Sequence, residues 1–218
     1  MAGWIIWRYN LDKITRLVVL ILVNLSVFQL AEFMVCEGAL GLDSLQWARI
    51  GYVAITLLPP LGIHLGLRLS GQHNPFLLLV AYGTAAVFSF IFLFVGSGMQ
   101  SQICLGNYVI FDIAPWAVWP YALYYFGWLL VGTVLALESA KVLKNKHQKS
   151  ALRALAVGYS AFIIPSTFVA IIDPSSMAGI PSIMCGFAVL LAFILTFKVV
   201  PEYHHACRNK KLRLALQA

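Results

Sequence analysis

Six runs of apolar residues, separated by short polar stretches, occupy most of the 218-residue chain. A helix needs about 20 predominantly apolar residues to cross the hydrocarbon core of a bilayer, and each run is about that long. The pattern therefore predicts an all-α polytopic transmembrane bundle that forms a single membrane domain, 1–218. The six predicted helices are 14–35, 47–69, 75–96, 115–137, 151–172 and 180–200.

Three segments lie outside these runs. Residues 1–13 combine tryptophan and isoleucine with neither a basic leader nor a small-residue cleavage site, so we expect an interfacial segment rather than a signal peptide. Residues 201–218 begin at Pro201, which is expected to end the sixth helix, and form a basic cytoplasmic tail. The longest connection, 97–114, is expected to be an outer loop that serves as a lid or a partner surface.

The charged residues predict the orientation of the bundle. When the runs are threaded through a membrane in order, fourteen of the fifteen Lys and Arg residues fall on one side, and only Arg49 falls on the other. Lys and Arg near helix ends stay in the cytoplasm, so both termini are expected there. The opposite side collects four acidic residues, Glu37, Asp43, Asp112 and Asp173.

The composition excludes several classes of protein. The chain is 61% hydrophobic and 11% charged, with a mean hydropathy of +0.86. Soluble domains carry about 25% charged residues, so a water-soluble core is excluded. The net charge of +7 does not indicate a nucleic-acid partner, because the basic residues lie at helix ends and in loops, where topology and anionic lipid place them. We expect an integral protein of a prokaryotic cytoplasmic membrane, with anionic lipid at its cytoplasmic face.

An acidic residue inside the first predicted helix is the clearest candidate for function. Glu32 lies about one turn from the outer end, and an ionisable group at that depth is costly. Asn24, Phe28 and Glu32 share one helix face. Glu32 either forms an ion pair with Arg49 at the start of the next helix or serves as a ligand or proton site, and both interpretations stay open.

A double proline predicts a kink in the second helix. Pro59 and Pro60 each remove a backbone donor, so freed carbonyl groups must find partners inside the bundle, and Thr56 and His64 are near enough in sequence to help. The kink is either static or a hinge.

Two glycines and a histidine follow this kink. Gly62 and Gly66 have the GxxxG spacing that permits close helix approach, either within the bundle or against a partner. His64 lies between them, but a b-type haem would need a second membrane histidine, and the sequence has none. A buried, hydrogen-bonded histidine is therefore expected, and no cofactor.

Aromatic residues crowd the outer half of the fourth helix. Trp116 and Trp119 fit an interfacial belt. Tyr121, Tyr125 and Trp128 lie deeper and form one stripe at i, i+4 and i+7, which faces lipid, packs against a helix or lines a pocket for an apolar ligand beneath the loop 97–114. The candidate pocket residues are Glu32, Asn24, His64, Tyr121, Tyr125 and Trp128.

The sequence contains no recognisable catalytic or metal-binding motif. The four cysteines have no metal-ligand spacing, and a Cys36–Cys104 disulfide is possible because both fall outside. No nucleophile, phosphate-binding or zinc-protease motif occurs, so an enzyme is disfavoured. Lys198 lies too near the cytoplasmic end for a retinal Schiff base.

Part of the chain resembles a known family. The stretch 47–61, Trp-Ala-Arg-Ile-Gly-Tyr-Val-Ala-Ile-Thr-Leu-Leu-Pro-Pro-Leu, with Arg68-Leu-Ser-Gly after it, resembles the third helix of the N-terminal seven-transmembrane sensor region of histidine kinases. Three other stretches fit in order, at 29–33, 115–127 and 164–174. The family has seven helices where this chain shows six, and it continues into output domains. The resemblance implies a stand-alone sensor module that signals through a separate cytoplasmic partner.

Three functions are therefore carried forward. The first is a sensor or receptor-like module that binds an apolar or small ligand and transmits helix shifts to its cytoplasmic face. The second is an accessory subunit of a larger membrane complex, held by the Gly62 and Gly66 face. The third is a small transporter or lipid-processing enzyme, for which only Glu32, Asn24 and His64 supply polar groups in the membrane.

Overall fold

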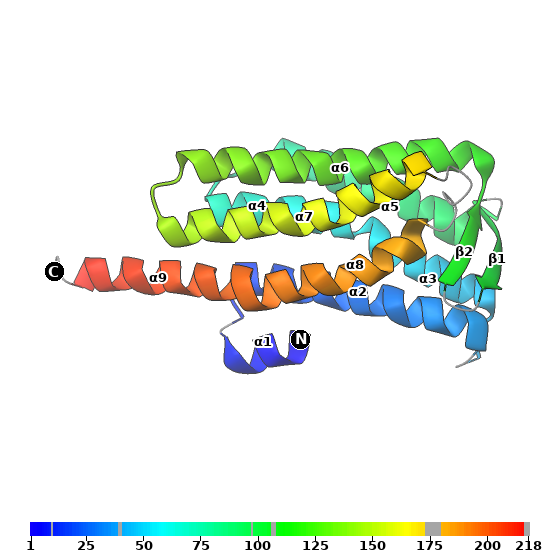
Figure 1. The fold of residues 1–218 in the computed structure, drawn as a ribbon, viewed down its shortest axis with the longest axis horizontal. Coiled ribbons are helices and arrows are strands. Elements are labelled where there is room, and N and C mark those ends of the chain that lie inside the picture. Colours follow the sequence, from blue (N-terminus) through cyan, green and yellow to red (C-terminus); the bar gives the residue numbers. More distant parts are fainter. Residues whose placement is uncertain (10, 39–40, 97, 106–107, 173–179, 216–218) are drawn as a thin grey trace.

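A computed structural model shows a bundle of long helices that is covered at one end by a β-hairpin (Figure 1). The structure describes residues 1–9, 11–38, 41–96, 98–105, 108–172 and 180–215, with side chains for these except at 100–112, 162, 170, 180–185 and 209–215. In this part of the chain, six helical segments are long and apolar enough to cross a membrane, as predicted. The helices are α1 (Ala2–Arg8), α2 (Lys13–Glu37), α3 (Ser44–Thr56), α4 (Leu58–Ser70), α5 (Pro75–Phe94), α6 (Pro115–Val142), α7 (Lys146–Ile172), α8 (Ile180–Ile194) and α9 (Val200–Ala215).

Local capping residues set where several helices begin and end. The Asp12 carboxylate accepts a hydrogen bond from the Thr15 N–H at 2.8 Å and starts α2. Asp43 and Gln46 form a reciprocal capping box at the start of α3. Gly71 ends α4 with a φ of 72°, a left-handed conformation that glycine adopts without a steric penalty.

The predicted kink in the second transmembrane segment is a break between α3 and α4. Leu57 separates the two helices, and Pro59 and Pro60 lie in the first turn of α4. Backbone N–H groups in a first turn have no partner within their helix, so proline is tolerated there. The two helices together still form one membrane-crossing segment, Ser44–Ser70.

Pro201 does not end the sixth transmembrane segment, contrary to the sequence prediction. Leu195–Val199 form a π-helix, in which the Val200 N–H bonds to the Leu195 carbonyl, and α9 continues through Pro201 to Ala215. A proline inside an α-helix lacks an N–H and clashes with the preceding turn. The wider π turn accommodates this, so the predicted tail is largely a helix.

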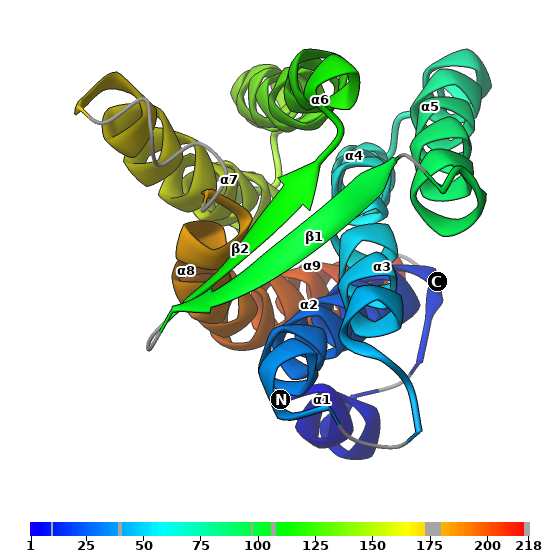
Figure 2. The same ribbon diagram turned by 90° about the vertical axis from the view of Figure 1, so that its right-hand side faces the viewer.

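The predicted outer loop contains two antiparallel strands, so the bundle is not purely α-helical. Strands β1 (Met99–Leu105) and β2 (Tyr108–Ile113) pair with Cys104 opposite Val109, and the register is irregular between Met99 and Ser101. The hairpin lies across the end of the bundle and contacts α2, α3 and α8 (Figure 2). It covers the helices at what we call the hairpin end.

Packing is dense around α2 and looser around α5. α2 contacts α3, α4 and α8, and α6 packs on α4 and α7. α5 stands at the edge of the bundle (Figure 2), and large apolar side chains such as Phe76, Leu79 and Phe94 are exposed on it. Apolar side chains on the outside are expected where lipid is the solvent.

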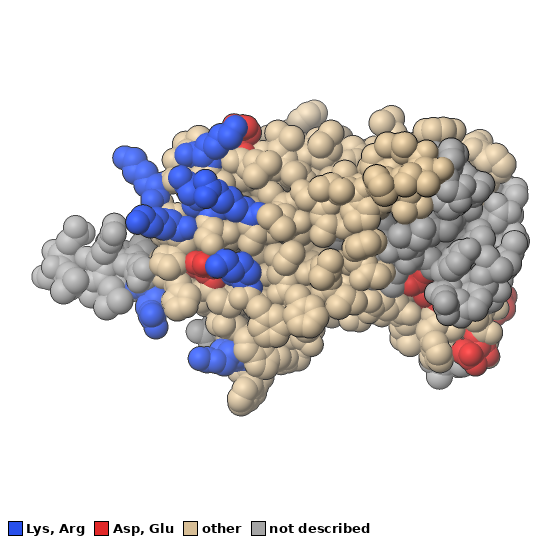
Figure 3. Space-filling model, in the orientation of Figure 1, with Lys and Arg blue, Asp and Glu red and all other residues tan. Residues whose placement is uncertain are grey.

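The basic residues gather at one end of the molecule. On the face shown in Figure 3, Lys and Arg side chains cluster at the end that holds the α6–α7 connection and α9, which we call the basic end. Acidic side chains lie near the hairpin end on the same face, and others lie among the basic side chains (Figure 3). The asymmetry that the sequence predicted is therefore present in the folded chain.

Candidate functional site

The break between α3 and α4 is tied to α6 by hydroxyl groups. Pro60 has no N–H, so the carbonyl of Thr56 four residues earlier has no partner in its own helix. The Tyr124 hydroxyl donates to this carbonyl at 2.6 Å. The Thr56 hydroxyl donates to the Tyr52 carbonyl at 2.6 Å, and the Tyr121 hydroxyl lies 3.0 Å from the same Thr56 oxygen. The carbonyl freed by Pro60 is thus satisfied from α6, inside the bundle.

Tyr121 packs among aromatic rings of α3 and α5. Its ring meets Phe92 edge-on at 5.0 Å between centroids, and it lies 5.3 Å from Phe88 of the same helix, α5. Tyr52 of α3 joins the cluster at 4.9 Å from Phe92. Tyr121 is therefore a core residue that joins α3, α5 and α6.

Trp128 has a different partner from Tyr121 and Tyr125. Its indole Nε1 donates to the Thr84 hydroxyl at 3.1 Å and ties α6 to the peripheral helix α5. The side chain is half-buried. The three residues of the predicted stripe thus make three separate contacts. The predicted pocket beneath 97–114 depends on side chains outside the described ones and stays a prediction.

Tyr125 lines a small cavity at the centre of the bundle, together with Tyr159 of α7. The cavity has room for about one water molecule. The Tyr159 hydroxyl is buried there without a hydrogen-bond partner among the described groups. The lining residues are Ile21, Leu58, Gly62, Tyr125, Leu129, Leu155, Tyr159, Leu191 and Leu195.

Glycines make room for Tyr159 and for the close packing of α4. A Cβ at Gly62 would overlap the Tyr159 hydroxyl oxygen, and one at Gly132 would lie 3.1 Å from the Tyr159 ring. A Cβ at Gly66 would lie 3.1 Å from a Leu135 methyl group on α6. The GxxxG pair therefore serves packing inside the bundle, against α6 and α7.

The predicted ion pair between Glu32 and Arg49 is absent from the ion pairs of the described side chains. Gly51 faces α2, because a Cβ there would meet Ala31 at 3.1 Å and Phe28 at 3.3 Å. Arg49 precedes Gly51 by two residues, which is about 200° around the helix, so it points away from α2. Its Nε is buried without a hydrogen-bond partner, whereas Glu32 is half-buried and has an interaction partner.

Asn24 and His64, the other polar candidates, are both engaged in hydrogen bonds. The Asn24 side-chain amide donates to the Leu20 carbonyl of its own helix at 2.9 Å. His64 Nδ1 lies 3.2 Å from the Tyr82 hydroxyl, and Arg68 Nε donates to His64 Nε2 at 3.3 Å. Both ring nitrogens are engaged, as expected for a structural histidine, and neither candidate reaches the tyrosine cluster.

The cysteine at the hairpin end of α2 is oxidised. Cys36 is disulfide-bonded, whereas Cys207 in α9 is free. The side chain of Cys104 lies outside the described ones, so the Cys36–Cys104 pair stays a prediction. α2 contacts β1, the strand that contains Cys104.

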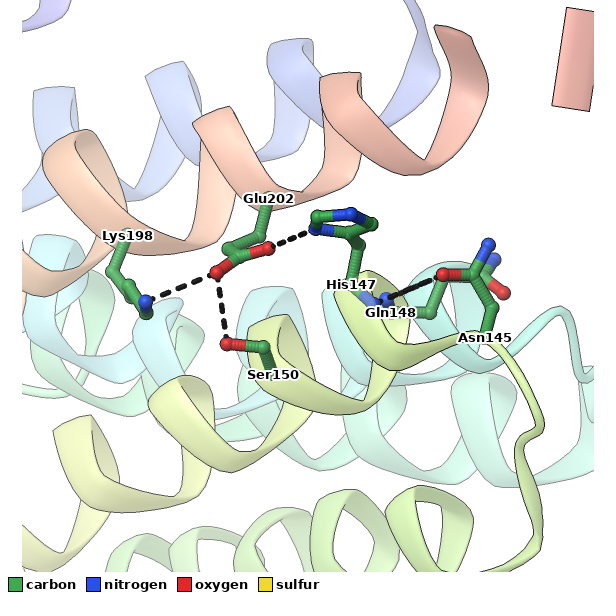
Figure 4. A network of polar contacts seen from close by, with 6 residues as sticks. All are labelled: Asn145, His147, Gln148, Ser150, Lys198 and Glu202. Atoms are coloured by element: carbon green, nitrogen blue, oxygen red, sulfur yellow. Dashed lines mark hydrogen bonds and ion pairs between the residues drawn. The ribbon is translucent and has the colours of Figure 1, made fainter. Parts of the chain in front are cut away.

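A polar network at the basic end joins α7 to α9 (Figure 4). Glu202 accepts hydrogen bonds from His147 Nδ1 at 2.7 Å and from the Ser150 hydroxyl at 3.0 Å, and Lys198 Nζ lies 3.0 Å from the same carboxylate. The Glu202 side chain is only 16% exposed. Asn145 caps α7 by accepting from the His147 N–H at 3.0 Å. We call Glu202, His147, Ser150 and Lys198 the inner network.

The inner network was not predicted from the sequence. Glu202 follows Pro201 and was assigned to a basic tail outside the bundle. The spacing of Lys198 and Glu202 at i and i+4, which favours an ion pair on one helix face, was the available signal. An ion pair at this spacing forms only if the helix continues through Pro201.

Replacing Glu202 by glutamine is expected to destabilise the protein by about 1–3 kcal/mol, because the carboxylate accepts charge-assisted bonds from two helices. Glu138→Gln is the matched control. Glu138 pairs with Lys141 at 2.6 Å on one helix, both side chains are more than half exposed, and such pairs contribute about 0.2–1 kcal/mol. Unfolding in detergent micelles measures both changes. Equal effects would show that the inner network does not hold α7 and α9 together.

The described residues hold no group of three or more His, Cys, Asp or Glu side chains that could bind a metal ion. Among the described residues, the candidate sites are the tyrosine cluster around Thr56, the central cavity and the inner network. These three sites lie along the bundle from its core to its basic end. Comparison with protein-family models, with curated proteins and with solved structures finds no match.

Proposed function

We propose that the protein is a membrane-embedded sensor module that transmits a change at the hairpin end to a cytoplasmic partner at the basic end. The observation that carries the proposal is the continuous path from the hairpin to the inner network. α8 contacts β2, runs into the π-helix Leu195–Val199, and continues as α9, where Glu202 binds α7. A shift of α8 would act directly on contacts that Glu202 makes.

Two helix irregularities support the proposal. The α3–α4 break and the π-helix both lie within membrane-crossing segments. Breaks and π turns allow the halves of a helix to move relative to each other, which is a common element of switching transitions. The resemblance of the Pro59-Pro60 segment to the sensor region of histidine kinases supports the same function, with a cytoplasmic signalling partner.

The structure gives less support to the two alternatives. An accessory subunit was expected to use the Gly62 and Gly66 face as an interface, but both glycines pack against α6 and α7 of the same chain. A transporter would need polar groups that cross several helices. Asn24 bonds to Leu20 within α2, and His64 bonds to Tyr82 of α5, so these two described residues do not form such a path.

The proposed orientation places the basic end in the cytoplasm of a prokaryotic cell. The clustering of Lys and Arg at one end supports it, because positive residues are retained inside (Figure 3). The disulfide at Cys36 supports it independently, since disulfides persist on the oxidising side of a membrane.

Cysteine labelling in intact cells tests this orientation. We expect an impermeant thiol reagent to label Asp43→Cys, at the start of α3, and to leave Lys144→Cys, in the α6–α7 connection, unlabelled until the cells are lysed. Cys185 and Cys207 are replaced by serine in both variants. Labelling of Lys144→Cys in intact cells would reverse the orientation.

Hydrogen–deuterium exchange in lipid nanodiscs tests transmission. Cys36→Ser removes the disulfide at the hairpin end, and we expect faster amide exchange at the opposite end, in α9 and in the first turn of α7. Cys207→Ser, at a free cysteine, is the control and should leave α7 unchanged. An effect of Cys36→Ser that stays confined to the hairpin and the adjoining helix ends would contradict the proposal.

A further inference from the structure

The short N-terminal helix α1 contacts the π-helix and α9, which form the basic end of the proposed path. Ile5 is fully buried against the bundle. The Trp4 ring lies 5.6 Å from that of Phe197 in the π-helix, and the Tyr9 ring stacks on that of His204 in α9 at 4.7 Å. One side of α1 is therefore held by the π-helix and α9, beside α2 (Figure 1).

The other side of α1 exposes large apolar side chains. Trp7 is 83% exposed, and Ile6 and Met1 are about half exposed. Arg8 ends the helix directly beside Trp7. A tryptophan with aliphatic neighbours and an adjacent arginine is suited to the boundary between headgroups and acyl chains of a bilayer.

The charge around α1 selects the kind of lipid. Arg8, Lys13 and Arg16 follow within nine residues of Trp7, and none of the three forms an ion pair with a described side chain. Each basic residue near an anionic membrane surface contributes about 1 kcal/mol of attraction. The surface therefore fits a bilayer that contains anionic phospholipid.

The turn after α1 connects this surface to α9. The Thr15 hydroxyl lies 3.3 Å from His204 Nε2. Burial raises the pKa of the Asp12 carboxyl, but hydrogen bonds from the Thr15 backbone and from Tyr203 outweigh this and hold the pKa below its ordinary value. Asp12 thus stays ionised at neutral pH and bonded to α9. Tyr203 and His204 directly follow Glu202 of the inner network.

From these contacts we infer that α1 is a lipid-binding arm that recognises anionic phospholipid headgroups through its Trp7–Arg8 surface and thereby holds α9 in position. Lipid recognition by α1 stands on the exposed surface alone. Only the consequence for α9 rests on the proposed sensor function.

Fluorotryptophan NMR in nanodiscs tests lipid recognition. We expect the Trp7 signal to shift, and to broaden with nitroxide-labelled lipid, when phosphatidylglycerol is mixed into phosphatidylcholine. Trp119, which is 71% exposed at the other end of the bundle, is the control and should not respond to the headgroup. Arg8→Gln should raise the half-saturating fraction of phosphatidylglycerol about fivefold, the factor that corresponds to about 1 kcal/mol. A Trp7 signal that is the same in both lipids, or that shifts with soluble glycerol phosphate alone, would overturn the inference.

Amide exchange of α9 in the same nanodiscs tests the second step. Phosphatidylglycerol should slow exchange in α9 of the wild-type protein and have no such effect in Trp7→Gln, whose exposed site allows normal folding. A Trp7 signal that responds to phosphatidylglycerol while α9 does not would overturn the coupling to α9 and leave the lipid site. The proposed transmission is tested separately, by the effect of Cys36→Ser at the hairpin end on amide exchange in α9 and α7. The two failures can therefore be told apart.

Discussion

Gly62→Ala is expected to destabilise the protein by about 3 kcal/mol, because a methyl group has no space at this position. The Cβ would overlap the Tyr159 hydroxyl, and Tyr159 is held on its other side by Gly132. Overpacking a close-packed site typically costs about 1–3 kcal/mol, and a ring confined on both sides places this one at the upper end. Unfolding in mixed detergent micelles measures the change.

Two variants make this prediction specific. Gly83→Ala, also within a helix but with open space around its Cβ position, should be neutral or stabilising by up to about 1 kcal/mol. Tyr159→Phe removes a buried hydroxyl that has no partner among the described groups, so it should have little effect alone and should relieve part of the cost of Gly62→Ala. If Gly62→Ala and Gly83→Ala change the free energy of unfolding equally, α4 and α7 do not approach each other closely at Gly62.

Tyr124→Phe is expected to cost about 1–3 kcal/mol, because it leaves the Thr56 carbonyl without a hydrogen bond in the membrane interior. Tyr125→Phe is the matched control. Tyr125 is the next residue and equally buried, but it forms no hydrogen bond with the described residues, so its hydroxyl should matter less. Unfolding under the same conditions compares the two.

A second background tests the reason for this effect. Pro60→Ala restores a backbone N–H that can bond to the Thr56 carbonyl within the helix. In that background Tyr124→Phe should cost less than in the wild-type protein, as a double-mutant cycle would show. The same cost in both backgrounds would mean that the carbonyl freed by Pro60 is not what Tyr124 satisfies.

The transmembrane helices could be predicted because their signals are local. Length of the apolar run and capping residues such as Asp12 and Asp43 act within a few residues of a helix end, so α2 at Lys13–Glu37 differs from the predicted 14–35 by only two residues at most. The hairpin was missed although Gly106-Asn107 stands between two strand-like stretches, a combination typical of a tight turn. The apolar runs on both sides of this segment favour a connecting loop between two membrane helices, so the sequence predicts a loop at 97–114 and no strands.

The candidate site could be predicted only in part, because spacing defines a helix face but not its partner. The spacing puts Tyr121 and Trp128 on one face of α6, yet the groups that they meet, Thr56 and Thr84, come from other helices. The same limit applies to Arg49, whose direction depends on how Gly51 packs against α2. Such contacts follow from tertiary packing rather than from local sequence.

The π-helix makes the number of residues between α8 and α9 more important than their identity. Each residue turns an α-helix by 100°, and a π turn holds an extra residue. Deleting that residue from Leu195–Val199 would restore a regular α-helix and leave α9 close to its present orientation, whereas inserting a further residue would rotate all of α9 by about 100° relative to α8. Glu202 would then leave His147, and the rings of Tyr9 and His204 would separate. Substitution of Phe197, whose ring meets Trp4, should therefore affect only the contact with α1, whereas an inserted residue would displace all of α9.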